Sequence, residues 1–205
     1  MACCGGSSRS SIEIRRDAQH QRILAAAMAC FSRTGFHSAS MNEICREAGM
    51  SAGNLYRYFP SKDSIIEALA EEERIRNSAF FQALEDAEDP VAGLIDIGLN
   101  YLNDAASREF RLCTEVLAEA QRNPRISEMF QKNIAQAREA LGKALTRGVE
   151  NGQVEASLDI EMTVKIIMAL GDGLLAHRNI DPSLPGPRLD TAFRGILERL
   201  LRPRS

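Results

Sequence analysis

Hydrophobic residues recur along this chain at the three- and four-residue spacing of helices, and no stretch alternates as a strand does. Residues 17–34 predict a first helix that Gly35 ends, and residues 40–62 predict two short helices. Further segments with helical spacing are residues 62–84, 90–106, 109–122, 124–151, 159–175 and 189–201. The pattern predicts an all-α fold of about nine helices.

Residues 40–62, SASMNEICREAGMSAGNLYRYFPSK, predict two short helices joined by a tight turn. Ser40 caps the first helix, and Glu43 lies three residues on, where it completes a capping box. Gly49 ends that helix at a position that often takes left-handed backbone, and Ser51 caps the second helix. Two short helices joined in this way can enter the DNA major groove.

The second of these helices has an apolar face and a polar face. Leu55 and Phe59 share one side and are expected to point inward. Gly53, Asn54 and Arg57 lie elsewhere on its surface. Arginine pairs with guanine and asparagine with adenine in the major groove, and a glycine lets the backbone approach closely. We therefore expect this helix to read bases.

A known family signature covers the same segment. Residues 49–51 (GMS), 53–59 (GNLYRYF) and 61–62 (SK) resemble the DNA-binding motif of the tetracycline-repressor (TetR) family. The resemblance implies a three-helix head that binds double-stranded DNA and a larger helical body that binds a ligand and forms a dimer.

The resemblance also implies roles for single residues. Ala52, Gly53 and Tyr56 would lie nearest the bases, and Tyr58 and Lys62 would lie on phosphates. Partial core packing with a hydrated hydroxyl group is the alternative for both tyrosines.

Ser40 and Ser51 have two compatible roles. Their hydroxyls and the helix ends they cap would face phosphates, or they would serve as caps alone.

Charge divides the chain in the same place. The net charge is −3, yet residues 1–62 carry eight basic and four acidic side chains, and the remainder carries 17 basic against 24 acidic. A basic N-terminal third suits a surface that meets phosphates. We expect a disordered arm at 1–14, a helix-turn-helix DNA-binding domain at 15–62, and a ligand-binding and dimerisation domain at 63–205.

The last two predicted helices are candidates for a dimer seam. One head is too small for tight specific binding, whereas a homodimer reads two half-sites of a palindromic operator. Residues 159–175 and 189–201 carry broad apolar stripes, and Gly171 and Gly173 allow close backbone approach. The alternative is that both helices close the core of a single chain.

The C-terminal bundle is expected to hold a small-molecule effector of unknown identity. Residues 114–120 (TEVLAEA), 123–124 (NP) and 172–174 (DGL) resemble the betaine-regulator-like subgroup of the family. Most of the candidate lining residues would be ordinary core in any helical bundle. They are Phe81, Leu94, Ile97, Tyr101, Cys113, Val116, Leu117, Phe130, Ile134, Met168 and Asp172.

Other kinds of site find little support. The three histidines are scattered and no Cys-x-x-Cys pair occurs, so we expect no metal and no cofactor. Cys30 and Cys45 fall on apolar helix faces and are expected in the core, whereas oxidant sensing by Cys3, Cys4 or Cys113 stays open. An apolar run of about 18 residues is absent, as is a signal peptide, which predicts a cytoplasmic protein that does not span a membrane.

The sequence favours a homodimeric repressor whose operator binding is relieved by the effector. A ligand-independent or activating DNA-binding protein of the same fold is the alternative. An enzyme is disfavoured, because no nucleophile–base motif or glycine-rich phosphate loop occurs. The operator, the regulated genes and the effector are not specified by the sequence.

Overall fold

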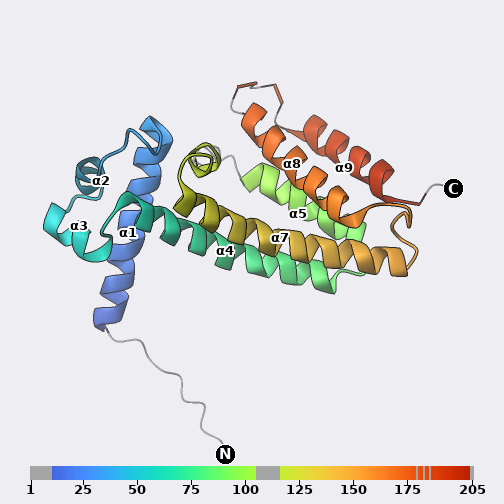
Figure 1. The fold of residues 1–205 in the computed structure, drawn as a ribbon, viewed down its shortest axis with the longest axis horizontal. Helices are drawn as coiled ribbons and strands as arrows, with labels where there is room; N and C mark the ends of the chain where they lie inside the picture. Colours follow the sequence, from blue (N-terminus) through green and yellow to red (C-terminus); the bar gives the residue numbers. More distant parts are fainter. Residues whose placement is uncertain (1–10, 105–115, 179, 182, 185, 204–205) are drawn as a thin grey trace, which may run out of the picture. The chain divides into compact units, whose positions relative to one another are not determined.

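The computed structural model describes residues 11–104, 116–178, 180–181, 183–184 and 186–203. Throughout this part the regular structure is helical, which confirms the all-α prediction (Figure 1). Eight helices have assigned bounds, and residues 116–120 are also helical. The bounds are α1 Ser11–Thr34, α2 Met41–Glu47, α3 Ala52–Tyr58, α4 Lys62–Asp86, α5 Pro90–Asp104, α7 Pro124–Glu150, α8 Ile160–Arg178 and α9 Pro187–Leu201.

The chain forms two compact units, which we call the head (Met1–Leu69) and the body (Ala70–Ser205). Helix α4 begins in the head and continues into the body. Among the described residues, no helix is long and apolar enough to cross a bilayer.

The head has the buried faces that the sequence predicts. Ile23, Leu24 and Phe31 of α1 are almost fully buried, as are Ile44 of α2 and Leu55 of α3. Cys30 and Cys45 are also buried, as expected for small core residues. Burial raises the pKa of the Cys30 thiol and so disfavours its reactive thiolate form.

Helix α1 is longer than the sequence predicts. It begins at Ser11, so residues 11–14, which we placed in the disordered arm, are helical. Glu13 lies in the first turn, where a negative charge interacts favourably with the helix dipole and stabilises the helix. The remainder of the expected arm, residues 1–10, lies outside the described part.

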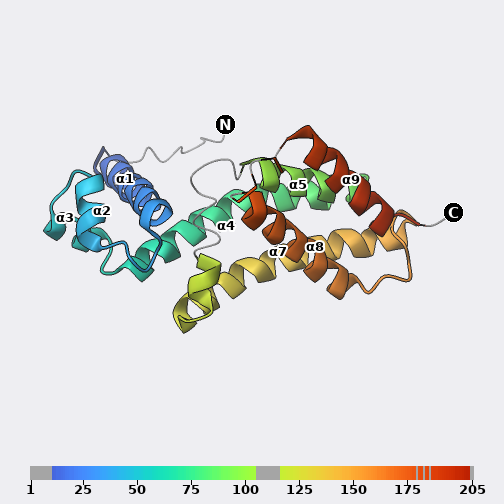
Figure 2. The same cartoon turned by 90° about the horizontal axis from the view of Figure 1, so that it is seen from above.

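The body is built around α5, which packs against α7, α8 and α9 (Figure 2). Side chains cap two of these helices. Asp89 Oδ1 accepts hydrogen bonds from the backbone N–H of Val91 (2.9 Å) and Ala92 (3.1 Å) at the start of α5. Asn123 Oδ1 caps α7 in the same way.

The body core joins all four of these helices. Phe193 and Leu197 of α9 lie in one cluster with Leu94 and Ile95 of α5. The cluster also includes Leu145 of α7. Helices α5, α7, α8 and α9 therefore share one apolar core, and α5 contacts each of the other three.

Side chains of α7 hold the body part of α4. Arg147 donates to the carbonyl oxygens of Leu84 (2.9 Å) and Glu85 in the last turn of α4 and of Ala87 (3.0 Å) just after it. Asn133 Nδ2 donates to the carbonyl oxygen of Ala70 (3.1 Å), further toward the start of that helix. Both contacts fix α4 to α7.

Candidate DNA interface and effector domain

The turn between α2 and α3 is fixed by the predicted capping residues. The Ser40 hydroxyl accepts from the Glu43 N–H (3.2 Å), and a Glu43 carboxylate oxygen accepts from the Ser40 N–H (2.8 Å). The hydrogen bonds that the Glu43 carboxylate accepts from the N–H and the hydroxyl of Ser40 lower the pKa of Glu43. The Ser51 hydroxyl accepts from the Asn54 N–H (3.3 Å). The capping box and the second cap are both confirmed.

Gly49 takes the left-handed backbone that was predicted, with φ at +60°. Arg22 Nη2 of α1 donates to its carbonyl oxygen at 3.1 Å. A Cβ on Gly49 would lie 2.6 Å from that nitrogen, so a larger residue would displace the arginine. Helical spacing gives no sign of this contact, because Arg22 and Gly49 are 27 residues apart in the sequence.

Helix α3 presents its polar face to solvent. Leu55 is 0% exposed and Phe59 is 4% exposed, as predicted, whereas Tyr56 is 49% exposed. Arg57 is exposed as well. A Cβ on Gly53 would meet no atom within 4 Å within the head. This face is free for close approach by a partner.

The other DNA candidates differ in accessibility. Asn54 and Tyr58 are half-buried, and the Arg57 guanidinium lies 5.8 Å from the centre of the Tyr58 ring. Ser40, Ser51 and Ala52 are exposed, although both serine hydroxyls are engaged in caps.

Lys62 is bound inside the head. Its ammonium group donates to the carbonyl oxygens of Phe36 (2.8 Å) and His37 (2.9 Å). It also lies 4.8 Å from the centre of the Phe36 ring. An ammonium group has three N–H donors, so one is left for a phosphate. The structure therefore gives Lys62 a stabilising role in the head, in addition to the phosphate contact that the family resemblance implies.

The predicted effector residues occupy several environments in the body. Leu94 is part of the buried core, and Ile97 and Met168 pack against it. Leu117 is 38% exposed. Cys113 lies outside the described residues. The remaining apolar candidates are half-buried and are Phe81, Val116, Phe130 and Ile134.

Tyr101 and Asp172 are brought together from α5 and α8. The tyrosine hydroxyl donates to Asp172 Oδ1 at 3.0 Å. Burial raises the pKa of the Asp172 carboxyl, and the hydrogen bond from Tyr101 opposes that rise. The pair is a polar group inside an otherwise apolar set of candidates.

Helices α8 and α9 divide their apolar stripes between core and surface. Ile167, Leu175, Phe193 and Leu197 are buried. The exposed apolar residues are Met162 (49%), Ile166 (55%), Ile196 (52%) and Leu200 (39%). We call these four residues the apolar surface stripe.

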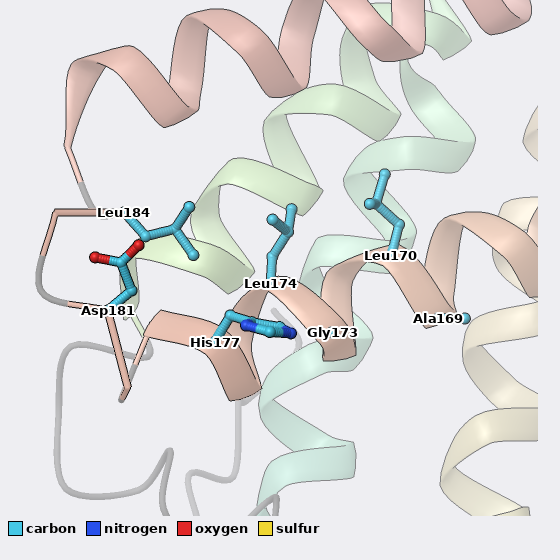
Figure 3. A pocket seen from close by; sticks show the side chains of 7 residues that line it. All are labelled: Ala169, Leu170, Gly173, Leu174, His177, Asp181 and Leu184. Carbon is cyan, nitrogen blue, oxygen red and sulfur yellow. The ribbon is translucent and has the colours of Figure 1, made fainter.

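A groove of about 350 Å³ lies along α8. Its walls are mainly apolar, with His177 and Asp181 at one end (Figure 3). The groove is lined by Ala169, Leu170, Gly173, Leu174, His177, Asp181 and Leu184.

The capped helix pair, its exposed second helix and the all-helical body define a helix-turn-helix DNA-binding protein. Residues 23–69 match the family model described as bacterial regulatory proteins, tetR family. Residues 91–202 match the model of the C-terminal domain of BetI-type transcriptional repressors. The chain belongs to the TetR family of transcriptional regulators, and the family and its relatives are regulators rather than enzymes.

Individual relatives agree with this assignment. The chain is 30% identical over 155 residues to the transcriptional regulator UidR of Escherichia coli K12, covering 76% of this chain and 79% of UidR. Among solved structures, GusR of Salmonella enterica is 30% identical, with a TM-score of 0.78 over 90% of this chain and 95% of GusR. FadR of Bacillus subtilis, solved with stearoyl-CoA, shares the fold at 18% identity, with a TM-score of 0.76 over 87% of this chain and 97% of FadR.

Proposed function

We propose that this regulator is a homodimeric repressor that binds a palindromic operator through α3 and leaves it when a small-molecule effector binds the body. The observation that carries the proposal is the exposed, capped face of α3, where Gly53, Tyr56 and Arg57 are open to solvent. Such a protein acts in the cytoplasm, where its DNA lies.

The DNA contacts follow from accessibility. Tyr56 and Arg57 extend from α3, and Ala52 and Gly53 leave room for the groove wall. Arg57 is the strongest base reader, because a guanidinium can donate two hydrogen bonds to guanine. Asn54 and Tyr58 are half-buried and contribute less to the binding of DNA. Ser40, Ser51 and Lys62 contact the DNA phosphates with the hydrogen-bonding capacity that their contacts within the head leave over.

Fluorescence anisotropy with duplex fragments from upstream of the gene tests this interface. We expect saturable binding that survives excess random DNA. Arg57→Met should weaken it and reduce the slope of log K against log salt concentration by about 1. Tyr56→Ala should weaken binding without that change in slope, because tyrosine carries no charge.

The control is Arg138→Met, which removes an exposed arginine from α7 of the body. DNA binding of this variant should match the unaltered protein. If Arg57 and Arg138 behave alike, or if binding is weak and disappears with modest salt, the proposed interface is wrong.

The apolar surface stripe supports dimerisation through α8 and α9. Four large apolar side chains exposed in two helices form a surface that a second copy would bury. Ile166→Glu should therefore convert a dimer to a monomer in sedimentation velocity. Ile75→Glu is the matched control, because Ile75 is 58% exposed against 55% for Ile166 but lies on α4. Equal effects of the two substitutions would contradict this seam.

Effector control needs a physical link from the body to the head. Helix α4 supplies continuous backbone between them, and Arg147 and Asn133 fix its body part to α7. The stearoyl-CoA complex of B. subtilis FadR supports a body of this fold as the place for an effector. An effector that favours a conformation with unsuitably spaced heads weakens DNA binding by its differential affinity.

A further inference from the structure

Arg22 joins α1 to the turn of the helix-turn-helix. Its Nη2 donates to the carbonyl oxygen of Gly49 at 3.1 Å, across 27 residues of sequence. Gly49 lies two residues after the end of α2 and two residues before Ser51, the N-cap of α3. The contact therefore acts at the point where the chain leaves one helix and enters the other.

Hydrogen bonds within the turn tie it to α2. The Gly49 N–H donates to the Arg46 carbonyl oxygen (3.1 Å), and the Met50 N–H donates to that of Cys45 (3.0 Å). With Gly49 at φ +60°, these two bonds form the Schellman motif that ends many helices. The motif sets the shape of the turn, whereas the Arg22 bond sets its position against α1.

Other side chains of α1 act at further ends of the same helix pair. Arg33 pairs with Glu47 at the end of α2 (3.3 Å), and the His20 ring lies 4.8 Å from the Phe59 ring directly after α3. Arg22 lies between these two residues along α1 and acts near the start of α3. The N-terminal residues of a recognition helix contact base edges, so a shift of the turn displaces the part of α3 that reads bases.

We propose that Arg22 is a positioning residue for DNA recognition, which holds the start of α3 in the orientation that base reading requires. The proposal rests on the DNA interface proposed above and adds the residue of α1 that orients it. Arg22 acts through the Gly49 carbonyl group rather than on DNA. Loss of this contact misplaces the hydrogen bonds to base edges, whereas contacts with phosphates carry no sequence information and are retained.

Fluorescence anisotropy with two duplexes of equal length, one from upstream of the gene and one of random sequence, measures this discrimination. Arg22→Met keeps the apolar stem and removes the donor. We expect the ratio of the two affinities to fall about fivefold, the factor that corresponds to one net hydrogen bond. The slope of log K against log salt concentration should stay unchanged, because a positioning residue neutralises no phosphate. A slope reduced by about 1 would make Arg22 a phosphate contact and overturn the proposal.

The affinity ratio separates positioning from a loss of stability, because partial unfolding lowers the active fraction equally for both duplexes. Arg22→Lys keeps a charged donor for one carbonyl oxygen and should restore most of the discrimination. Arg15→Met removes an exposed arginine about two turns earlier on α1 and should leave the ratio unchanged. The proposal is overturned if Arg22→Met leaves the ratio unaltered or if Arg15→Met lowers it equally.

A substitution on the other side of the contact gives an independent test. Gly49→Ala would place a Cβ 2.6 Å from Nη2 of Arg22 and displace the guanidinium. It should therefore lower the affinity ratio at least as much as Arg22→Met. The double variant should lose little more than Gly49→Ala alone, because both changes remove the same contact. Fully additive losses would show that Arg22 does not act through Gly49.

Nuclear magnetic resonance of the free protein tests the contact without DNA. Arg22→Met should shift the amide signals of residues 49–54 and speed hydrogen exchange of the Asn54 N–H, which donates to the Ser51 hydroxyl. Unchanged signals and exchange in this segment would overturn the positioning role, whether or not a specific duplex has been found.

The positioning role and the proposed interface fail in distinguishable ways. Weakened binding in Arg57→Met, with full discrimination in Arg22→Met, would retain the interface and overturn the positioning role. Unaltered binding in Arg57→Met, with lost discrimination in Arg22→Met, would contradict Arg57 as a base reader and support the role of Arg22.

Discussion

Replacing Lys62 by methionine removes a charge that the structure places between backbone carbonyl groups. The ammonium donates to Phe36 and His37 at 2.8 and 2.9 Å and lies 4.8 Å from the Phe36 ring. Methionine keeps most of the apolar stem, so the change isolates the polar contacts. The expected consequence is a less stable head.

The magnitude follows from the exposure of each contact. A hydrogen bond from a charged donor contributes about 1.5–3 kcal/mol when it is shielded and less when water can replace it. The bond to Phe36 is partly buried and the bond to His37 is exposed, so only the first retains most of that range. With the ring contact added, the free energy of unfolding should fall by about 2 kcal/mol.

Urea unfolding followed by circular dichroism measures this loss. With a denaturant slope of about 2 kcal/mol per molar, the midpoint should fall by about 1 M. Hydrogen exchange of peptides from residues 36–69 should rise, which assigns the loss to the head. Arg57→Met is the control, because its guanidinium contacts the Tyr58 ring at 5.8 Å rather than a carbonyl group.

Two results would refute this reasoning. A Lys62→Met protein that unfolds at the unaltered urea concentration, yet binds DNA weakly, would show that Lys62 acts on phosphate alone. An equal loss of stability in Arg57→Met would show that removal of any head cation destabilises the fold.

Other contacts in the body give sharp expectations. Hydrogen bonding to Arg202 lowers the pKa of Asp89 from 3.8. The ionised Asp89 therefore stabilises the fold above that pH, and this stabilisation is lost as the pH falls through the lower pKa of the folded state. Asp89→Asn, which keeps a capping side chain, should show a weaker loss of stability in acid when urea midpoints are compared across pH. Gly98→Ala should lower stability by about 1–3 kcal/mol by overpacking, because its Cβ would lie 2.7 Å from the Phe193 ring. A Cβ at Gly142 would have no atom of the described body within 4 Å. Gly142→Ala should therefore raise stability by about 0.5–1 kcal/mol, and a less stable variant would show that this position has no room for a methyl group.

The sequence predicted features whose cause lies within one helical turn. Ser40 and Glu43 are three residues apart, and their capping box forms as expected. Asp89 and Asn123 start α5 and α7 for the same reason, since each side chain bonds N–H groups two and three residues on. Such signals need no knowledge of the tertiary structure.

Contacts between distant residues could not be predicted in this way. Lys62 and Phe36 are 26 residues apart, and Tyr101 and Asp172 are 71 apart. Apolar spacing has a related limit. Ile75 lies in the segment 62–84, whose apolar residues have helical spacing, yet this residue is 58% exposed. Periodicity shows which residues share a face but does not show what covers that face.

The same limit explains the predicted effector site. The sequence grouped Leu94 and Tyr101 as lining residues because both are apolar or aromatic and lie on one helix. In the structure Leu94 is 2% exposed in the core, whereas Tyr101 is 37% exposed and bonded to Asp172. The two residues can be distinguished only when the position of α8 is known, and the spacing of apolar residues in α5 gives no information about that position.

Helix α4 shows how local and distant contacts combine. At its first residue, Lys62 donates to two carbonyl oxygens of the head. At the other end, Arg147 donates to two carbonyl oxygens in the last turn of α4 and to one just after it, and so fixes α4 to α7. Each end of the connecting helix is therefore fixed within its own unit by one cation and several carbonyl groups. Moving either end of α4 within its own unit would break charge-assisted hydrogen bonds.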